Sequence, residues 1–152
     1  MEFCSPFLIY NYAIIIYAMN VVLFQKLERL KEEVLYLKTN KTKLLKSLRT
    51  SVEIKKATER SVYLCSEIVL DIADMVIVLN SFPKPSTYSD SIYKLGEHRI
   101  VPKDFARKFV YIAGLRNFLA HDYQIDTLPD LKRFLKSGIC DIERFISYIE
   151  KL

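Results

Sequence analysis

Residues 115–123 read Leu-Arg-Asn-Phe-Leu-Ala-His-Asp-Tyr, and they place four chemically capable side chains at the end of an apolar helical pattern. These side chains are Arg116, Asn117, His121 and Tyr123. Arginine is a permanent cation that suits phosphate groups, and histidine exchanges its proton near neutral pH. The combination indicates the chemistry or the binding of phosphate esters. The alternative interpretation is a polar helix end, because Arg and His near a C-terminus favour the helix dipole and the last carbonyl groups.

The residues before this stretch predict the helix that carries it. Pro102 suits the first turn of a helix, and Phe105 and Phe109 follow at helical spacing. On a straight helix with about 100° per residue, Arg116 continues this aromatic stripe and His121 lies about 140° away. Either the helix ends or distorts before His121, or the site is completed across a subunit boundary. Four small residues permit the close approach of a second helix and favour a dimer in which two motifs meet: Ala106, Ala113, Gly114 and Ala120.

The most apolar stretch, residues 58–80, predicts a central and buried helix. Its polar side chains follow one another at i, i+7, i+11 and i+14, which is a single helix face. Carboxylates on a buried face need partners, and two candidates are Arg116 and polar groups across a dimer interface. We interpret the residues of this face as groups that orient or neutralise rather than react. They are Arg60, Glu67, Asp71 and Asp74.

Further helices are predicted on both sides of this central one. Residues 21–38 have the period of an amphipathic helix. Residues 81–87 are rich in proline and predict a linker, and residues 88–97 predict a short helix. We expect a last helix to begin with Thr127 as its N-cap and to bend at Gly138.

A run of five basic residues without an acidic one lies between Val34 and Val52. The run is either a solvated helix face or a patch that follows the phosphates of RNA or docks an acidic partner. The net charge of +5 agrees with an anionic partner, although the excess is small. The five residues are Lys38, Lys41, Lys43, Lys46 and Arg49.

The N-terminal stretch from Phe3 to Gln25 carries no charge, and it is long enough to cross a bilayer. Three interpretations follow. Translation begins at Met19, or residues 3–24 anchor the protein in a membrane, or the segment folds onto the domain or its dimer mate. We therefore divide the chain into an apolar N-terminal extension, residues 1–18, and a domain, residues 19–152.

The length of 152 residues suits one domain with a sizeable core. The three cysteines, Cys4, Cys65 and Cys140, are widely spaced and form no Cys-x-x-Cys pair. This pattern argues against a zinc site or a disulfide framework and favours a reducing, cytoplasmic compartment. We expect no metal and no cofactor, and we expect Cys65 to be buried because it lies in an apolar run.

The motif Arg116-Asn117-x-x-x-His121-x-Tyr123 resembles the Arg-x4-His-x-Tyr motif of HEPN-domain toxins, specifically of the HepT-like family. The similarity extends from about Met19 to the C-terminus. Three further blocks carry it: Glu59-Arg60 with Glu67, Asp71 and Asp74 on the long apolar helix, then Pro85-x-x-Tyr88, then Val101-Pro102.

This resemblance implies an all-α, HEPN-like bundle of about five helices that forms a homodimer through the motif helix and its neighbours. It also implies the toxin of a HEPN/MNT toxin–antitoxin system, a metal-independent endoribonuclease. His121 would assist proton transfer, Arg116 would clamp the phosphoryl oxygens, and Asn117 would bond to the imidazole or to phosphate. Tyr123 would accept AMP from a partner nucleotidyltransferase of the MNT type, whose added bulk and charge would repel RNA. Without the resemblance, Tyr123 reads equally well as a ring packed at the helix end.

Two other classes of function stay open. A non-catalytic HEPN module would hold a nucleotide, an RNA or a partner enzyme without cleaving it. A membrane-anchored interaction protein would use residues 3–24, and fractionation of the full chain against one that starts at Met19 would identify it. Loss of cleavage but not of folding in Arg116→Ala would favour the enzyme.

Overall fold

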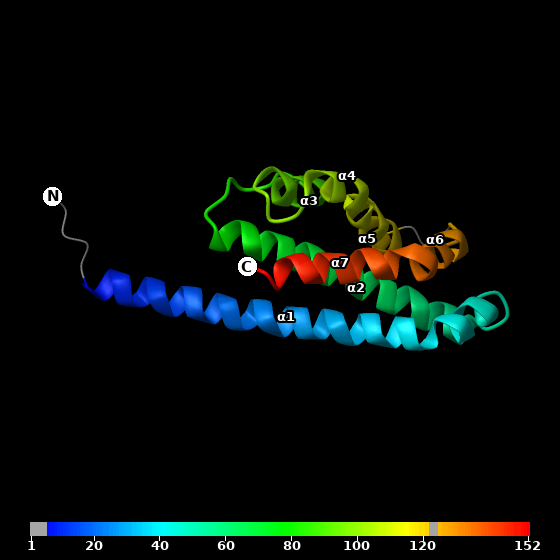
Figure 1. Ribbon diagram of the computed structural model, residues 1–152. Helices are drawn as coiled ribbons and strands as arrows, with labels where there is room; N and C mark the ends of the chain where they lie inside the picture. The colour runs from blue at the N-terminus through cyan, green and yellow to red at the C-terminus, as the bar shows by residue number, and fades with distance from the viewer. Residues whose placement is uncertain (1–5, 122–124) are drawn as a thin grey trace.

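The computed structural model describes residues 6–121 and 125–152, with side chains from Tyr12 onward (Figure 1). All regular structure within these residues is helical, which confirms the predicted all-α class.

Two long helices form an antiparallel pair that supports the other elements (Figure 1). Helix α1 spans Pro6–Ser47 and helix α2 spans Val52–Leu79. Leu30 and Leu37 of α1 are fully buried, two helical turns apart, against the central α2. Twelve of the 28 residues of α2 are buried, and they extend from Thr58 to Ile77, which confirms that it is the buried helix that its sequence predicts.

The start of α2 differs from the prediction. Ser51 adopts an extended backbone and accepts a hydrogen bond at 3.2 Å from the backbone N–H of Ile54. This N-cap satisfies one of the free donors at the helix start, so α2 begins at Val52 rather than at Thr58. Three of the six additional residues are charged (Glu53, Lys55 and Lys56), which is why the continuous apolar run alone did not include them.

The C-terminal rod combines three helical segments. Helix α6 spans Leu128–Arg133, the π-helical segment η1 spans Phe134–Gly138, and helix α7 spans Ile139–Ile149. A Cβ atom on Gly138 would lie 2.6 Å from the ring of Phe134, closer than a side chain tolerates. The bend predicted at Gly138 is therefore a π-helical turn that closes on this ring.

Thr127 occupies the N-cap position of α6, as predicted, but it does not cap the helix with its side chain. Its backbone is already helical, at φ −79° and ψ −10°, and its side chain makes no capping bond. The hydroxyl of Thr127 instead donates a hydrogen bond to the carboxylate of Glu59 on α2. Because that acceptor is a carboxylate from another helix, tertiary contact overrides the local preference for capping.

The predicted helix that carries the motif is divided in two. After α3, Tyr88–Glu97, the chain forms α4, Lys103–Phe109, and α5, Tyr111–His121, with the division at Val110. The two helices pack in different directions: the ring of Phe109 stacks on that of Phe145 in α7 at 5.4 Å, whereas α5 packs against α2. The bend at Val110 lets both apolar faces reach the core. When α4 is counted with α5, and α6 with η1 and α7, the described chain has five helical units. This agrees with the predicted bundle of about five helices.

The N-terminal half of α1 is continuous with the rest of the helix, and its first turns extend beyond the other helices (Figure 1). Tyr12, Ile15 and Tyr17 are between 56% and 72% exposed, so these three side chains are not buried against the other described helices. Among the described helices, none is both long and apolar enough to cross a membrane. The division at residue 18 stays a prediction.

Candidate functional site

Arg116 lies on the inner side of α5, where Glu67 of α2 holds it. Its Nε donates to one carboxylate oxygen of Glu67 at 2.5 Å, and its Nη2 donates to the other at 3.3 Å. This paired contact lowers the pKa of the Glu67 carboxyl and raises the pKa of the Arg116 guanidinium, because each charge favours the other. Two bonds to one carboxylate fix the plane of the guanidinium and leave its Nη1 for other partners.

Two tyrosine rings also contact Arg116. The guanidinium carbon lies 5.0 Å from the ring centre of Tyr88 and 5.9 Å from that of Tyr63. Aromatic faces attract cations, so both rings add to the hold on Arg116. Tyr88 belongs to the Pro85-x-x-Tyr88 block of the sequence, but nothing in its spacing predicts this contact. Tyr63 was not singled out at all, because a tyrosine on a buried helix reads as core.

Asn117 and His121 lie on the outer side of α5, where both are exposed. The Oδ1 of Asn117 accepts a hydrogen bond at 3.3 Å from Nη1 of Arg116. Helix α5 reaches His121 without a break, so it does not end or distort before the histidine. Arg116 and His121 of one chain therefore remain about 140° apart around the helix and about 7.5 Å apart along it. Tyr123 falls outside the described residues.

The polar face of α2 is shared among three neighbouring helices. Glu67 pairs with Arg116 of α5, which is one of the two kinds of partner that the sequence left open. Asp71 does not contact Arg116: it pairs with Lys26 of α1 at 2.6 Å. Asp74 accepts a hydrogen bond at 2.6 Å from the hydroxyl of Ser91 on α3. Asp71 and Asp74 thus serve the packing of α1 and α3 rather than the motif.

The segment that follows the motif is tied to the first turns of α2. Lys55 forms an ion pair with Asp126 at 3.0 Å, and the carboxylate of Glu59 accepts the hydroxyl of Thr127. The N-terminal part of α2 therefore lies beside both the end of α5 and the start of α6. Arg60, next along this part of α2, lies with its guanidinium carbon 5.5 Å from the ring centre of Tyr63.

Comparison with models of known protein families identifies the family of this chain. A family model described as Ribonuclease HepT-like matches residues 24–149. The chain belongs to the HepT-like family. The tRNA nuclease HepT of Aphanizomenon flos-aquae is 27% identical over 103 residues, which are 68% of this chain and 70% of that protein. The mRNA nuclease HepT of Shewanella oneidensis is 27% identical over 86 residues, which are 57% of this chain and 65% of that protein.

Solved structures share the HepT-like fold. The tri-AMPylated HEPN toxin of Shewanella oneidensis, in complex with MNT antitoxin, has a TM-score of 0.72 at 18% identity and covers 88% of this chain and 98% of its own. YutE of Bacillus subtilis, a cytosolic protein of unknown function, has a TM-score of 0.75 at 17% identity and covers 87% and 88%. At such identities the likeness establishes the fold.

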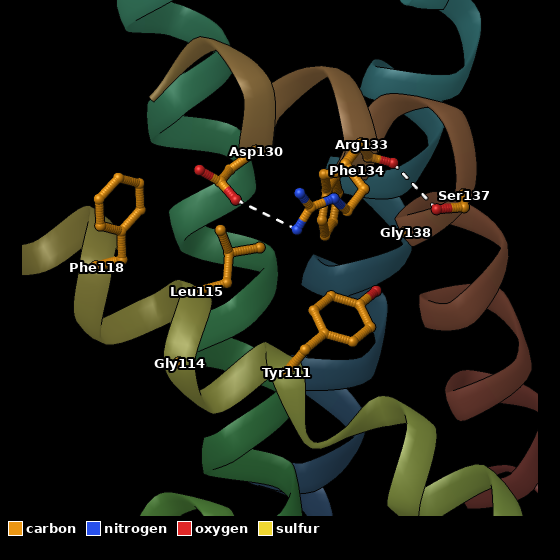
Figure 2. A pocket seen from close by; sticks show the side chains of 9 residues that line it. All are labelled: Tyr111, Gly114, Leu115, Phe118, Asp130, Arg133, Phe134, Ser137 and Gly138. Carbon is orange, nitrogen blue, oxygen red and sulfur yellow. Dashed lines mark hydrogen bonds and ion pairs between the residues drawn. The ribbon is translucent and has the colours of Figure 1, made fainter. Parts of the chain in front are cut away.

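A pocket of about 580 Å³ opens on the outer side of the motif helix in this HepT-like chain (Figure 2). Tyr111, Gly114, Leu115 and Phe118 of α5 line one wall, and α6 with η1 lines the other. The walls are mostly apolar, and an ion pair between Asp130 and Arg133 crosses one end. A Cβ atom on Gly114 would meet nothing within 4 Å. The space in front of Gly114 is therefore open, on the same side of α5 as Asn117 and His121.

The basic run on α1 is used partly for packing in the HepT-like fold. Lys38 forms an ion pair with Glu143 of α7 at 2.6 Å, and the Nζ of Lys41 donates to the carbonyl of Lys136 at 3.4 Å. Lys43 and Lys46 are exposed, in agreement with a solvated helix face. His98, the second histidine, is an exposed residue whose ring stacks on Phe82 at 3.8 Å.

The remaining candidate groups lie away from the motif. Burial raises the pKa of the Cys65 thiol, which confirms the prediction that Cys65 is a core residue. Across the described part of the HepT-like chain, no three His, Cys, Asp or Glu side chains are grouped so that they could hold a metal ion.

Proposed function

We propose that this HepT-like chain is the toxin of a toxin–antitoxin pair and that it cleaves RNA without a metal ion. The 2′-oxygen of the RNA attacks the neighbouring phosphorus, and the bond from phosphorus to the 5′-oxygen breaks. The products are a 2′,3′-cyclic phosphate and a 5′-hydroxyl. His121 takes the proton from the 2′-hydroxyl or gives one to the leaving oxygen, and Arg116 stabilises the charge on the phosphoryl oxygens.

The observation that carries this proposal is the state of Arg116 within the family motif. Its guanidinium is a permanent cation held in a fixed plane by Glu67, with Nη1 directed to Asn117. Such a preorganised cation stabilises developing charge without having to reorient during the reaction. Asn117 extends the same polar edge toward the outer side of α5, where an RNA phosphate and the imidazole are accessible.

A homodimer completes the site in this proposal. Because Arg116 and His121 of one chain face different sides of α5, the two motif helices that meet at the interface complete the site between them. The apolar pocket beside Gly114 supports this arrangement, since it opens along the motif helix and leaves room for a side chain of a second copy.

Tyr123 is the proposed point of control. A nucleotidyltransferase antitoxin of the MNT type transfers AMP to its hydroxyl and thereby silences the toxin. Two observations support this proposal: Tyr123 lies two residues after His121 in the sequence, and a relative of the same fold is described as a tri-AMPylated toxin with its MNT antitoxin. The added phosphate repels the phosphates of RNA at the motif.

The decisive experiment is cleavage of total RNA in EDTA by the parent protein, after intact mass has shown that Tyr123 is unmodified. We expect His121→Ala and Arg116→Ala each to lower the rate at least about hundredfold. His98→Ala and Arg107→Ala are matched controls, because both residues are exposed and lie away from the motif, and they should cleave like the parent. Equal cleavage by all five proteins would point to contamination and refute the site.

The alternative is a non-catalytic module that binds RNA, a nucleotide or a partner enzyme. The open pocket beside α5 is the observation that favours it, because a partner could occupy that space. Binding of RNA by unmodified parent protein without any cleavage would support this alternative.

A further inference from the structure

A second hollow lies on the inner side of the motif helix, between α2 and the end of α5. It is an open groove of about 410 Å³, within the size range of small-ligand sites. We call it the α2–α5 groove. Tyr63 lines this groove and also contacts Arg116, so the groove adjoins Arg116. Its lining residues are Lys56, Glu59, Arg60, Tyr63, Leu119 and Ala120.

The groove combines positive charge with an aromatic ring. The guanidinium groups of Arg60 and Arg116 both lie within 6 Å of the ring centre of Tyr63. Lys56 and Arg60 are exposed. Within the described residues, the ion pairs at this end of α2 are made by Lys55 and Glu67 instead. The two cations lining the groove are therefore available to an anionic ligand.

The other lining residues do not oppose such a ligand. Glu59 is the one carboxylate in the lining, and one of its oxygens is already used, because it accepts a hydrogen bond from the hydroxyl of Thr127. Leu119 and Ala120 contribute half-buried apolar surface to the same lining as Tyr63. An aromatic ring and apolar surface in one groove suit an unpaired base, and the cations suit the phosphates on either side of it.

We propose that the α2–α5 groove is a subsite for one nucleotide of single-stranded RNA next to the phosphate that is cleaved. Tyr63 stacks on the base, Arg60 holds the adjoining phosphate, and Arg116 holds the phosphate at the motif. The substrate is a single strand, because only an unpaired base can leave its stack to enter the groove. This inference rests on the proposed function in one respect, that RNA is the ligand of the motif.

The test measures binding in EDTA by full-length His121→Ala protein, which cannot cleave in our proposal. The probe is a short single-stranded RNA with a fluorescent base analogue, followed by anisotropy and by quenching of the base. Arg60→Ala should weaken binding about tenfold and lower the salt dependence of log Kd by about 0.7, the value for one phosphate of a single strand. Tyr63→Ala should weaken binding about tenfold and abolish the quenching.

Matched controls separate the subsite from a general effect of charge or folding. Tyr63→Phe keeps the ring and should bind within about twofold of its parent. Lys108→Ala and Tyr93→Ala remove an exposed lysine and an exposed tyrosine elsewhere, and they should bind like the parent. Thermal unfolding of each variant shows whether Arg116 and its surroundings remain folded.

Three results would overturn the proposal. The first is unchanged RNA binding in both Arg60→Ala and Tyr63→Ala. The second is equal weakening for duplex and single strand, which would mean that no base enters the groove. The third is competition by free AMP at the concentrations at which RNA binds, which would make the groove a mononucleotide site.

The experiments can reject the subsite without rejecting the proposed catalysis, and the reverse. If the unmodified protein never cleaves but its RNA binding depends on Arg60 and Tyr63, the subsite stands and the nuclease proposal fails. If the parent cleaves and neither Arg60→Ala nor Tyr63→Ala raises KM for RNA, the nuclease proposal stands and the subsite fails.

Discussion

The contact between Arg116 and Glu67 determines what the motif arginine can do. Two hydrogen bonds to one carboxylate use part of the guanidinium, and the side chain is only 16% exposed. A flexible arginine would lose rotamer freedom on meeting phosphate, whereas this one has already lost it during folding. In the proposed function Glu67 is thus a positioning residue, which acts on RNA through Arg116.

Glu67→Gln tests this role at the residue scale. The amide keeps the shape of the carboxylate but loses its charge, so Arg116 should become mobile. We expect kcat for RNA cleavage to fall about tenfold and the free energy of unfolding to fall by about 1 kcal/mol. Asp71→Asn is the matched control, because it loosens a neighbouring ion pair with Lys26 and should leave kcat unchanged. An equal loss of kcat in both variants would show that Glu67 has only a structural role.

The residues of the motif could be chosen from the sequence, but several of their neighbours could not. Helical geometry was enough to separate Arg116 from His121. The need of a buried carboxylate for a partner made Arg116 a candidate, but it did not choose Glu67 over Asp71 and Asp74. The pair between Lys26 and Asp71 was missed because it joins two helices whose relative rotation is set by core packing. Tyr88 was missed as a contact of Arg116 for the same reason.

At the scale of elements, the break at Val110 determines how α5 is oriented on the core. The break frees α5 to follow α2, so Arg116 faces inward while Asn117 and His121 face outward. The apolar period before the motif continues through Val110 and predicts one helix, because the period records which residues are buried but not against which helix. Thr127 shows the same limit, since its cap was lost to a carboxylate of α2.

The π-helical segment η1 gives a second prediction at this scale. Gly138→Ala should lower the free energy of unfolding by about 1–3 kcal/mol, because the new Cβ would lie 2.6 Å from the Phe134 ring. Alanine normally stabilises a helix relative to glycine by about 1 kcal/mol, so the sign of the change is diagnostic. Chemical denaturation measures it, with Lys136→Ala at an exposed position of η1 as the control. A stabilised Gly138→Ala protein would show that η1 can relax to a regular helix.

At the scale of the whole molecule, the outer side of α5 is where a second copy would dock. The face contains Gly114, the pocket beside it and the exposed His121, whereas the inner side is occupied by α2. Where a small helical residue faces open space, a larger side chain fits in the single chain but would clash with a closely packed second copy.

Gly114→Leu uses this difference. The monomer should fold at least as well as the parent, because nothing lies within 4 Å of the new Cβ and leucine favours helix. We expect the dimer to dissociate at least about tenfold more readily and RNA cleavage to fall in proportion, as sedimentation equilibrium and cleavage rates would measure. Gly114→Ala, with less bulk, should lie between parent and leucine variant. A Gly114→Leu protein that stays dimeric and active would place the interface elsewhere.

The length of helix α1 affects how the mass of such assemblies is measured in solution. Its 42 residues give a rod of about 63 Å at 1.5 Å per residue, and one end of that rod stands clear of the bundle. A body of this shape experiences more friction than a sphere of the same mass and diffuses more slowly. Gel filtration calibrated with globular standards would therefore assign a single copy too large a mass and mistake it for a pair. Light scattering, which reads mass directly, does not make that error.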